Sequence, residues 1–322
     1  MNSRKKAVFI RLDKIGDLIC TLPMDQAPEL KDWEITWVIA KGLSFIPEHA
    51  EPKRRYIELD KNNPPEARQK FAELLKEFKP QVAISIQAPW WIGFLLWKNK
   101  VAKRIGVLSK WDSFLFLNAS LRQKRSQAVK HEAEYNFDLV RQIFPSQNLS
   151  AKAPVLKLKA KPQPRCLEQY FLEPKKYTVV HPGMAGSALN WPILHYIRLI
   201  ENLTARFKVV LTGTPADEPW LKEIKEHFKN NSQVICLQNR LDTSQLLYIL
   251  EQAAAVFAPS TGVIHMAASL GTPVFGFYSP ILVQSETRWG ARGPGPIHLF
   301  TPPKENPSMS SITPEQVLGA LQ

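Results

Sequence analysis

Cysteines and long apolar runs are both scarce in this chain of 322 residues. Its three cysteines, Cys20, Cys166 and Cys236, stand far apart with no metal-ligand spacing. This argues against a disulfide framework and indicates a reducing compartment. No stretch approaches the ~18 uncharged apolar residues that a membrane-spanning helix requires. The early apolar run over residues 7–10 ends at Arg11, which is too short for the core of a signal peptide. We therefore expect a cytoplasmic protein.

Acidic residues are fewer than basic ones. Lysine and arginine number 42 against 29 aspartate and glutamate residues, which gives a formal net charge of +13. This balance favours polyanionic partners, namely nucleic acid, an anionic membrane surface or phosphorylated substrates, and composition alone does not choose among them. The hydrophobic share of 44% is enough for real cores, and the length predicts two domains rather than one.

Short apolar segments alternate with amphipathic ones along the chain. In the first half we expect strands at 7–10, 34–40 and 82–86, with helices at 15–22 and 66–78. A proline-rich linker is expected at 145–165, where 155–158 could form a short strand. The second half predicts strands at 177–180, 208–211, 233–237 and 255–258, with a last strand at 273–277. Such alternation indicates an α/β fold with two doubly wound parallel sheets, one in an N-terminal domain (1–155) and one in a C-terminal domain (165–322). Ligands are expected in a cleft at the carboxyl ends of the strands.

The first loop lacks both glycine-rich nucleotide signatures, GxGxxG and GxxxxGK[ST], which weighs against a dinucleotide-binding or P-loop enzyme. It presents Asp13, Lys14, Gly16 and Asp17 directly after the first strand instead. Asp17, beside a glycine, could reach a ligand as a general base. It could equally cap the first turn of a helix, and the motif alone leaves both interpretations open.

Two later loops have the composition of anion-binding segments. Residues 181–187 (HPGMAGS) include small residues, which would let backbone amides approach a phosphate closely. An ordinary flexible loop has a similar composition. In residues 259–262 (PSTG) a strand meets a helix, whose start carries about half a positive charge and free amides that suit a diphosphate. His265, one turn into that helix, is more typical of a packed residue than of a catalyst.

Three stretches together resemble glycosyltransferase family 9, the heptosyltransferases of lipopolysaccharide core assembly. They are residues 11–23 (RLDKIGDLICTLP), 181–192 (HPGMAGSALNWP) and 260–273 (STGVIHMAASLGTP), with a weaker fourth at 212–218. The resemblance implies a GT-B fold, made of two Rossmann-like domains that face a central cleft. It also implies an inverting mechanism, ADP-heptose as the donor, a lipid-linked sugar acceptor, and Asp17 as the catalytic base.

The resemblance, the character of the loops and the basic segment at 90–130 together predict the residues that contact each substrate. For the acceptor they are Asp13, Lys14, Lys98, Lys103, Arg104 and His131. For the donor they are Gly183, Met184, Ser187, Thr214, Asp217, Leu241, Ser260, Thr261, Gly262 and His265. Asp217 is expected either to bind the nucleoside ribose or to start a solvated helix, and Leu241 to line an adenine slot. No cluster of metal-ligating residues is apparent, so we expect no metal and no cofactor.

Two positions depart from the family pattern, and both concern the donor. Leu189-Asn190 stands where family members often carry a basic residue before Trp-Pro, and Ser260 stands where an aspartate usually precedes Thr-Gly or Ser-Gly. The identity of the donor is therefore less well indicated than the class of reaction.

Aromatic and basic residues interleave between Trp90 and Lys130. The segment contains Trp90, Trp91, Phe94, Trp97, Trp111, Phe114 and Phe116, and between residues 98 and 130 its only acidic residue is Asp112. This mixture suits a membrane interface or a phosphorylated glycolipid, and it would also suit single-stranded nucleic acid or a core helix with solvated lysines. We favour an anionic glycolipid acceptor and the surface of the inner membrane, and expect no nucleic-acid partner because no known nucleic-acid module is present.

The sequence thus predicts a peripheral membrane enzyme that transfers heptose, or a related sugar, from a nucleotide-sugar donor to a lipopolysaccharide core acceptor. Two alternatives stay open at this stage. One is a GT-B sugar-nucleotide epimerase, which would need additional acid/base carboxylates. The other is a non-catalytic protein that binds glycolipid or nucleotide, which the residues Leu189 and Ser260 would suit.

Overall fold

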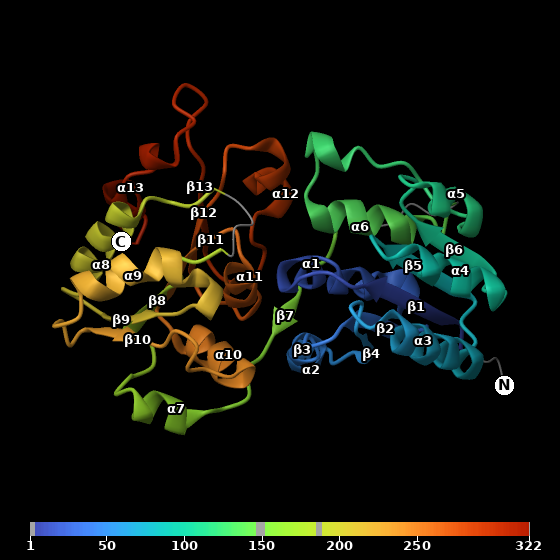
Figure 1. The fold of residues 1–322 in the computed structure, drawn as a ribbon, viewed down its shortest axis with the longest axis horizontal. Helices are drawn as coiled ribbons and strands as arrows, with labels where there is room; N and C mark the ends of the chain where they lie inside the picture. Colours follow the sequence, from blue (N-terminus) through green and yellow to red (C-terminus); the bar gives the residue numbers. More distant parts are fainter. Residues whose placement is uncertain (1–3, 146–151, 185–188, 322) are drawn as a thin grey trace. The chain divides into compact units, whose positions relative to one another are not determined.

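A computed structural model describes residues 4–145, 152–184 and 189–321. The chain divides into two compact units, each with its own parallel sheet (Figure 1). Unit 1 comprises Met1–Arg125 and Lys130–Leu156, and unit 2 comprises Ser126–Val129 and Lys157–Gln322.

Unit 1 is built on a five-stranded sheet with the order β4-β2-β1-β5-β6. Its strands are β1 (Lys6–Arg11), β2 (Glu34–Ala40), β4 (Arg55–Leu59), β5 (Val82–Ile86) and β6 (Lys103–Gly106), with a short β3 at Ala50–Glu51. Its helices are α1 (Ile15–Ile19), α2 (Phe45–His49), α3 (Pro64–Phe78), α4 (Trp90–Lys98), α5 (Trp111–Phe116) and α6 (Glu132–Arg141), with 3-10 turns at Leu22–Gln26 and Pro28–Leu30. A further 3-10 turn, Arg125–Gln127, begins in unit 1 and continues into the short segment assigned to unit 2.

The central strand β1 pairs in parallel with β2 on one side and with β5 on the other. Its residues Ala7 to Ile10 are fully buried, as expected for a strand covered on both faces. Because the chain moves outward from β1 in opposite directions, the strand order reverses between β1 and β5. The carboxyl ends of strands at such a reversal are where open α/β sheets bind ligands.

Helix α3 shows how the local sequence places a covering helix. Prolines occupy its first positions, where their missing amide protons are not needed. Phe71, Leu75 and Phe78 recur at helical spacing and are buried in the core of unit 1. The helix ends at Lys79, which takes the left-handed conformation (φ 52°) and donates its amide to the carbonyl of Leu75.

Unit 1 also contains a buried ion pair between Asp25 and Arg54. Both oxygens of Asp25 accept hydrogen bonds from Arg54, at 3.1 Å each, and Oδ2 also accepts one from Nε1 of Trp37 at 2.8 Å. Every partner is buried or nearly so. The pair fixes the turn after β3 against β2.

Unit 2 is built on a six-stranded parallel sheet with the order β10-β9-β8-β11-β12-β13. The strands are β8 (Tyr177–Val180), β9 (Lys208–Leu211), β10 (Val234–Cys236), β11 (Ala255–Pro259), β12 (Val274–Phe277) and β13 (Ile297–Phe300), and a short β7 lies at Lys157–Leu158. The helices are α7 (Pro164–Gln169), α8 (Ile193–Leu203), α9 (Glu218–His227), α10 (Thr243–Gln252), α11 (Gly262–Ser269), α12 (Glu286–Trp289) and α13 (Pro314–Gly319), with 3-10 turns at Pro215–Asp217, Leu282–Gln284 and Met309–Ser311.

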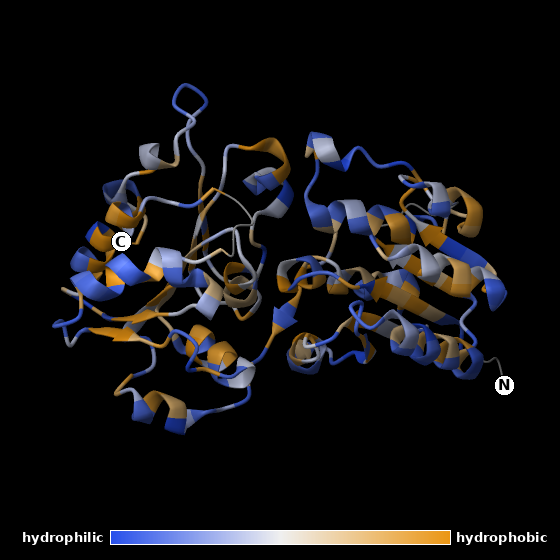
Figure 2. Cartoon of the chain, viewed as in Figure 1, coloured by the Kyte–Doolittle hydropathy of each residue, from blue (hydrophilic) through white to orange (hydrophobic). Residues whose placement is uncertain are grey.

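Aromatic stacking organises the core of unit 2. Trp191 is buried, with its ring stacked on Phe277 at 4.3 Å and at right angles to Tyr196 at 5.0 Å. Its indole Nε1 donates to the carbonyl of Ile312 at 2.8 Å. Figure 2 shows a pattern shared by both units: the strands are mostly hydrophobic, while the helices are hydrophobic only in part.

The predicted fold class is confirmed, and several elements need correction. The strand expected at 273–277 is not the last one, because β13 pairs beyond it, and the edge strands β4 and β6 were not predicted. The helix expected at 15–22 stops at Ile19 and gives way to a 3-10 turn. In the predicted linker, residues 146–151 lie outside the described residues, β7 forms within the segment proposed as a strand, and α7 begins at Pro164.

Candidate functional site

Three loops singled out in the sequence follow strands at the two points of reversed strand order. The loop with Asp13 and Asp17 follows β1, which neighbours β5 in unit 1. The loops beginning at His181 and Ser260 follow β8 and β11, which pair with each other in unit 2. The motifs therefore occupy the ligand-binding ends of the two sheets, each within its own unit.

A buried arginine holds the two aspartates of the first loop. Arg11, the last residue of β1, is completely buried and forms a hydrogen-bonded ion pair with Oδ1 of Asp17. Its Nε lies 3.0 Å from a carboxylate oxygen of Asp13, and its Nη1 lies 3.5 Å from Glu132 of α6. Asp17 keeps 20% of its side chain exposed. The carboxylate of Asp17 is thus held by a fixed cation while remaining open to a ligand.

This pairing bears on the capping interpretation of Asp17. Lys14 occupies the N-cap position of helix α1, and its side chain makes no capping hydrogen bond. The Asp17 carboxylate bonds to Arg11 instead of to a helix amide. The structure therefore favours a positioned carboxylate over a helix cap.

Burial and charge oppose each other in this cluster. Burial alone would lower the pKa of Arg11, but Asp17, Glu132 and Asp13 outweigh it and raise the pKa, so the guanidinium stays charged. Burial also raises the pKa of Asp13, against the opposing effect of Arg11 and a smaller one from Lys61. A carboxylate with a raised pKa is a stronger base than an exposed aspartate, so the pKa of Asp13 does not exclude it as the base.

A chain of hydrogen bonds ties helix α1 to helix α6. Thr21 donates to the carbonyl of Asp17 at 2.6 Å and accepts from Asn136 at 3.0 Å. Asn136 in turn accepts from Arg125 at 3.0 Å, and Arg125 also pairs with the buried Glu132. Because each link is buried or partly buried, the position of Asp17 depends on α6 as well as on its own loop.

The start of helix α11 offers unpaired donors to an anion. Its N-cap, Thr261, makes no side-chain capping bond, and the buried hydroxyl of Thr261 has no hydrogen-bond partner among the described residues. Gly262 begins the helix and brings no side chain to block the approach. First-turn amides, the helix dipole and a free hydroxyl together suit a phosphate group. His265, in contrast, is buried in the helix, so it is packed rather than exposed.

Asp217 packs closely against the loop that follows β8. Oδ2 of Asp217 accepts from both the amide and the hydroxyl of Thr214, at 2.8 Å each, and only 3% of the residue is exposed. The backbone at Gly183 passes so close that a Cβ there would lie 2.1 Å from Cγ of Asp217. Asp217 therefore shapes the loop that was predicted to bind the donor, and its role as a ribose ligand stays a prediction.

His181 in the same loop is buried and bonded through Nδ1 to the hydroxyl of Thr212 at 3.0 Å. Burial lowers its pKa to about 4, although Asp217 acts in the opposite direction. At neutral pH His181 is uncharged, so this loop offers a phosphate only backbone amides at that point.

The depressed pKa of His181 predicts a pH dependence of stability. The folded pKa lies below the unfolded value of 6.5, so stability is full above pH 6.5 and falls as the pH drops towards 4. The share due to His181 amounts to about 2 kcal/mol by pH 5. Denaturant unfolding at pH 7.5 and pH 5 measures it: His181→Gln should remove this share, whereas the matched His227→Gln, at an exposed ion pair, should keep it. Equal pH slopes in the wild type and His181→Gln would contradict the assignment.

The residue pair that departs from the family pattern has a structural role. Nδ2 of Asn190 donates to the carbonyl of Pro182 at 2.6 Å, and its Oδ1 accepts from the amide of Trp191 and the hydroxyl of Tyr196. Asn190 thereby closes the loop, and Leu189 beside it is exposed. Residues 185–188, and with them Ser187, lie outside the described residues. Of the other predicted donor contacts, Met184 is buried, Thr214 is exposed, and Leu241 and Ser260 are half-buried.

The residues predicted to bind the acceptor do not all gather near Asp17. Lys14 is exposed beside it. Lys103 is the first residue of β6 and pairs with Val82, which in turn pairs with Ala7 of β1. It therefore lies at the amino ends of the strands, about 13 Å along the strand direction from the level of Arg11. Its Nζ donates to the carbonyl of Ile143 at 3.1 Å.

The remaining predicted acceptor residues have different surroundings. Arg104 donates to the carbonyls of Phe116 and Val101, at 2.6 Å each, and burial lowers its pKa. His131 is buried and caps α6 by accepting from the amide of Ala133 at 3.1 Å. Lys98 is exposed at the end of α4. Arg104 and His131 are thus committed to the fold in the structure described.

Sequence reasoning missed three residues of the first loop's surroundings. Arg11 marks only the end of an apolar run in the sequence, and its pairing with the buried Glu132 was not predicted. Lys61 follows the unpredicted strand β4 and contributes positive charge near Asp13. Charged residues directly after a buried strand were the available signal, because such positions face the ligand edge of a parallel sheet.

Comparison with known proteins decides the family. The model of glycosyltransferase family 9 (heptosyltransferase) matches residues 68–309. The chain belongs to glycosyltransferase family 9. Family 9 membership confirms the resemblance seen in the sequence and makes the protein a glycosyltransferase rather than an epimerase.

Individual family 9 relatives agree. A Haemophilus influenzae protein named "Putative glycosyltransferase" is 29% identical over 98% of this chain and 95% of its own length. The lipooligosaccharide heptosyltransferase 2 of the same organism is 30% identical over 30% of this chain and 28% of its own. Among solved structures, Escherichia coli ADP-heptose lps heptosyltransferase II has a TM-score of 0.80 at 18% identity, covering 98% of both chains. The E. coli heptosyltransferase WaaC with ADP has a TM-score of 0.71 at 19% identity, again over 98% of both chains. These structures show that this family 9 chain has the GT-B fold.

The described residues of this family 9 enzyme contain neither a membrane-spanning helix nor a cluster of metal-ligating side chains. None of the helices in 4–145, 152–184 and 189–321 combines the length and apolarity of a bilayer-spanning segment. Within the same ranges, histidine, cysteine and carboxylate side chains form no group of three that would hold a metal ion.

Proposed function

We propose that this enzyme transfers a heptose, or a closely related sugar, from ADP-heptose to a lipopolysaccharide core acceptor at the cytoplasmic face of the inner membrane. The observation that carries the proposal is the Asp17 carboxylate, held by the buried Arg11 at the ligand edge of unit 1 and still partly exposed. The nucleotide sugar is supported by the free donors of Thr261 and α11 at the ligand edge of unit 2.

Asp17 would act as the general base of a single displacement. The acceptor hydroxyl oxygen forms a bond to the anomeric carbon of the donor sugar, and the bond from that carbon to the diphosphate breaks. The nucleoside diphosphate leaves with the bonding electrons, and the hydroxyl proton passes to Asp17. Because Arg11 bonds Oδ1, we assign the proton to Oδ2. A displacement of this kind inverts the anomeric centre, and a positioned base contributes roughly 10²–10⁴-fold.

The leaving diphosphate needs stabilisation that this chain would supply mainly through its backbone. The amides at the start of α11 and in the loop after β8 would carry most of it, with the hydroxyls of Thr261 and Ser260. His181 is neutral, and Leu189 places an exposed apolar side chain where relatives often have a cation. We therefore propose that the donor is held with fewer charged contacts than is usual in the family.

On the acceptor side, Asp13 and Lys14 would contact the reacting sugar because they share the loop of Asp17. Lys98, exposed at the far end of α4, would serve the anionic lipid part of the acceptor. Lys103, Arg104 and His131 would act indirectly, by holding the backbone segments to which they are bonded.

The test is nucleotide release from a panel of sugar nucleotides, with and without purified bacterial core acceptors. ADP-heptose with a core acceptor should give the highest acceptor-dependent release. Release from a different nucleotide sugar would correct the donor. Tight nucleotide binding with no release from any donor–acceptor pair would instead support the non-catalytic alternative that Leu189 and Ser260 left open.

A further inference from the structure

Helix α4 is apolar on the side that faces solvent as well as on the side that faces the core. Trp91, Ile92 and Leu96 are buried against the sheet of unit 1. Trp90, Phe94 and Trp97, at spacings of four and three, form a second stripe whose neighbouring rings lie 6.2 and 6.0 Å apart. Trp97 is 51% exposed. A helix of this composition in a water-facing position is unusual, because one face is normally polar.

Helix α5 extends the same apolar area. Phe116 packs edge-on against Phe94 at 5.7 Å and contacts Trp97 at 6.2 Å. The two helices meet at Gly93, where a Cβ would lie only 3.1 Å from Cβ of Phe116. This close packing holds α5 against α4, and it leaves Trp111, Phe114 and Leu115 outside, each more than half exposed.

We name the exposed area the α4–α5 surface; its outward side chains are Trp90, Trp97, Trp111, Phe114 and Leu115. Isolated exposed apolar residues such as Phe171 need no explanation, but several large ones on two packed helices do. An exposed apolar surface of this extent indicates a binding partner.

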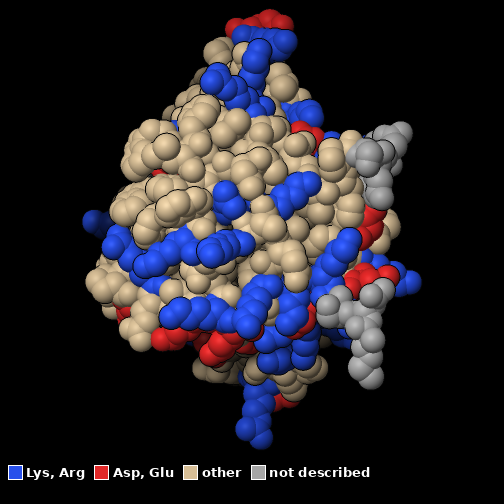
Figure 3. Space-filling model, turned by 90° about the vertical axis from the view of Figure 1, so that its right-hand side faces the viewer, with Lys and Arg blue, Asp and Glu red and all other residues tan. Residues whose placement is uncertain are grey.

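Cations border the α4–α5 surface almost without acids. The exposed basic side chains around it are Lys98, Lys100, Lys110, Arg122 and Lys124, and helix α4 contains no acidic residue. Asp112 is the only acidic residue between 98 and 130. Figure 3, which looks onto the side of unit 1 that carries these helices, shows blue lysine and arginine side chains bordering and crossing a broad uncharged area with few carboxylates.

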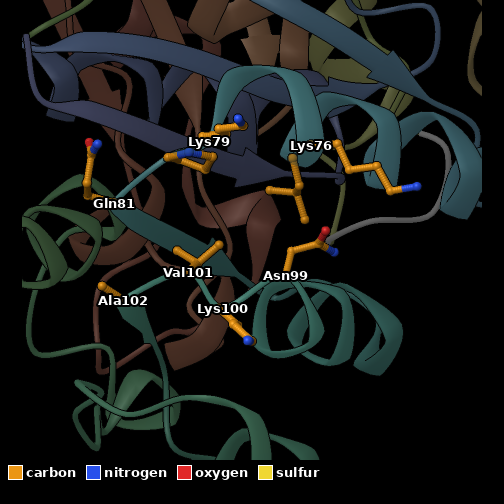
Figure 4. A pocket seen from close by; sticks show the side chains of 9 residues that line it. Lys76, Lys79, Gln81, Asn99, Lys100, Val101 and Ala102 are labelled. Carbon is orange, nitrogen blue, oxygen red and sulfur yellow. The ribbon is translucent and has the colours of Figure 1, made fainter. Parts of the chain in front are cut away.

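A hollow beside this surface contributes charge but no defined binding site. It has a volume of about 460 Å³, lies between the end of α3 and the start of β6, and includes Lys76, Lys79 and Lys100 in its lining. Figure 4 shows the three ammonium groups pointing in different directions rather than converging on one point. We therefore treat these lysines as a diffuse cationic border.

The aromatic rings are poorly placed to stack on nucleic-acid bases. The guanidinium of Arg68 covers the ring of Trp90 at 5.5 Å, and that of Arg122 covers Phe114 at 5.8 Å. Phe94, Trp97 and Phe116 pack on one another. Base stacking requires free ring faces in a basic groove. Tryptophan and phenylalanine beside lysine are instead the combination that partitions into a lipid headgroup region.

We propose that the α4–α5 surface docks this enzyme on a bilayer that contains anionic phospholipid, with Trp97, Trp111 and Phe114 inserted among the headgroups and the surrounding lysines over the lipid phosphates. The membrane location in the proposed function gives this docking its purpose, but docking itself requires neither donor nor acceptor. The two ideas can therefore fail separately.

The experiment measures vesicle co-sedimentation of the full chain without substrates. Wild type should bind phosphatidylglycerol–phosphatidylethanolamine vesicles and bind phosphatidylcholine vesicles far more weakly. Trp97→Ala/Trp111→Ala/Phe114→Ala should weaken binding to the anionic vesicles by about tenfold or more. Lys98→Gln, Lys110→Gln and Lys124→Gln should each cost roughly fivefold, less at high salt.

Matched variants on unit 2 provide the control. Phe171→Ala/Leu194→Ala removes two exposed apolar side chains, and Lys161→Gln removes one exposed lysine; neither should change vesicle binding. Circular dichroism and thermal unfolding establish that all variants are folded. Acceptor-dependent turnover with a soluble core oligosaccharide should survive the triple aromatic change, which separates docking from catalysis.

Three outcomes would overturn the proposal. One is wild-type binding that is equally strong on neutral and anionic vesicles, or absent from both. Another is unchanged vesicle binding in the folded triple aromatic variant. The third is a concentration-dependent dimer that this variant abolishes, because a second copy of the chain would then be the occupant.

Discussion

Asp17→Asn should reduce kcat by about 10²- to 10⁴-fold while the protein remains folded. Asparagine has nearly the same shape and can still accept a hydrogen bond from Arg11, but it cannot take a proton from the acceptor hydroxyl. Steady-state nucleotide release, measured with saturating donor and acceptor, gives kcat directly. Thermal unfolding of the same samples shows whether the loss is chemical rather than structural.

Asp13→Asn is the matched change in the same loop. Both aspartates pair with Arg11, and we assign Asp13 an acceptor contact because the family resemblance implies Asp17 as the base. We therefore expect Asp13→Asn to raise KM for the acceptor and to lower kcat by less than tenfold. If the two variants exchange these behaviours, Asp13 is the base.

Arg11→Met should produce a large loss of stability, about 3–5 kcal/mol, because it leaves neighbouring carboxylates without their shared counter-ion. Glu132 is fully buried and keeps Arg125, whereas Asp13 and Asp17 lose a direct partner. Asp17 also loses the hydrogen bond that positions its carboxylate, so kcat should fall in the protein that remains folded. Denaturant unfolding and nucleotide release measure the two effects.

Arg54→Met separates a general loss of stability from a specific effect on the base. Arg54 is also buried and pairs with an aspartate, Asp25, through two bonds of 3.1 Å within the same unit. We expect a comparable loss of stability with an unchanged kcat in the protein that remains folded. An unchanged kcat in folded Arg11→Met would show that Arg11 supports the fold without positioning Asp17.

The central strands could be predicted from the sequence, and of the four edge strands only β10 was predicted. Strands β2, β5, β8 and β9 match their predicted bounds because residues buried on both faces form continuous apolar runs. The missed strands β4, β6 and β13 all lie at sheet edges, where polar residues such as Arg55 and Lys103 dilute the pattern. The mostly apolar α4 was harder still, because composition does not tell a core helix from a helix with an exposed apolar face.

The candidate site was predictable at the level of loops and less so at the level of side chains. Loops at the carboxyl ends of strands could be found because a parallel sheet gathers them at one edge. The partnership of Arg11 with Glu132 could not, since the two are distant in sequence and meet only when α6 packs against β5 and the 3-10 turn at Leu22–Gln26. Similarly, His131 and Arg104 have polar side chains typical of binding sites, and their hydrogen bonds to the backbone are visible only in three dimensions.

The most direct test of the account follows the sugar itself. Purified enzyme, ADP-heptose and a lipopolysaccharide core acceptor are incubated, and released ADP and the mass of the acceptor are measured in the same sample. We predict one heptose added for each ADP released, no release without acceptor, and neither product with Asp17→Asn. ADP release that does not need the acceptor, or an acceptor that gains mass equally with Asp17→Asn, would contradict the account.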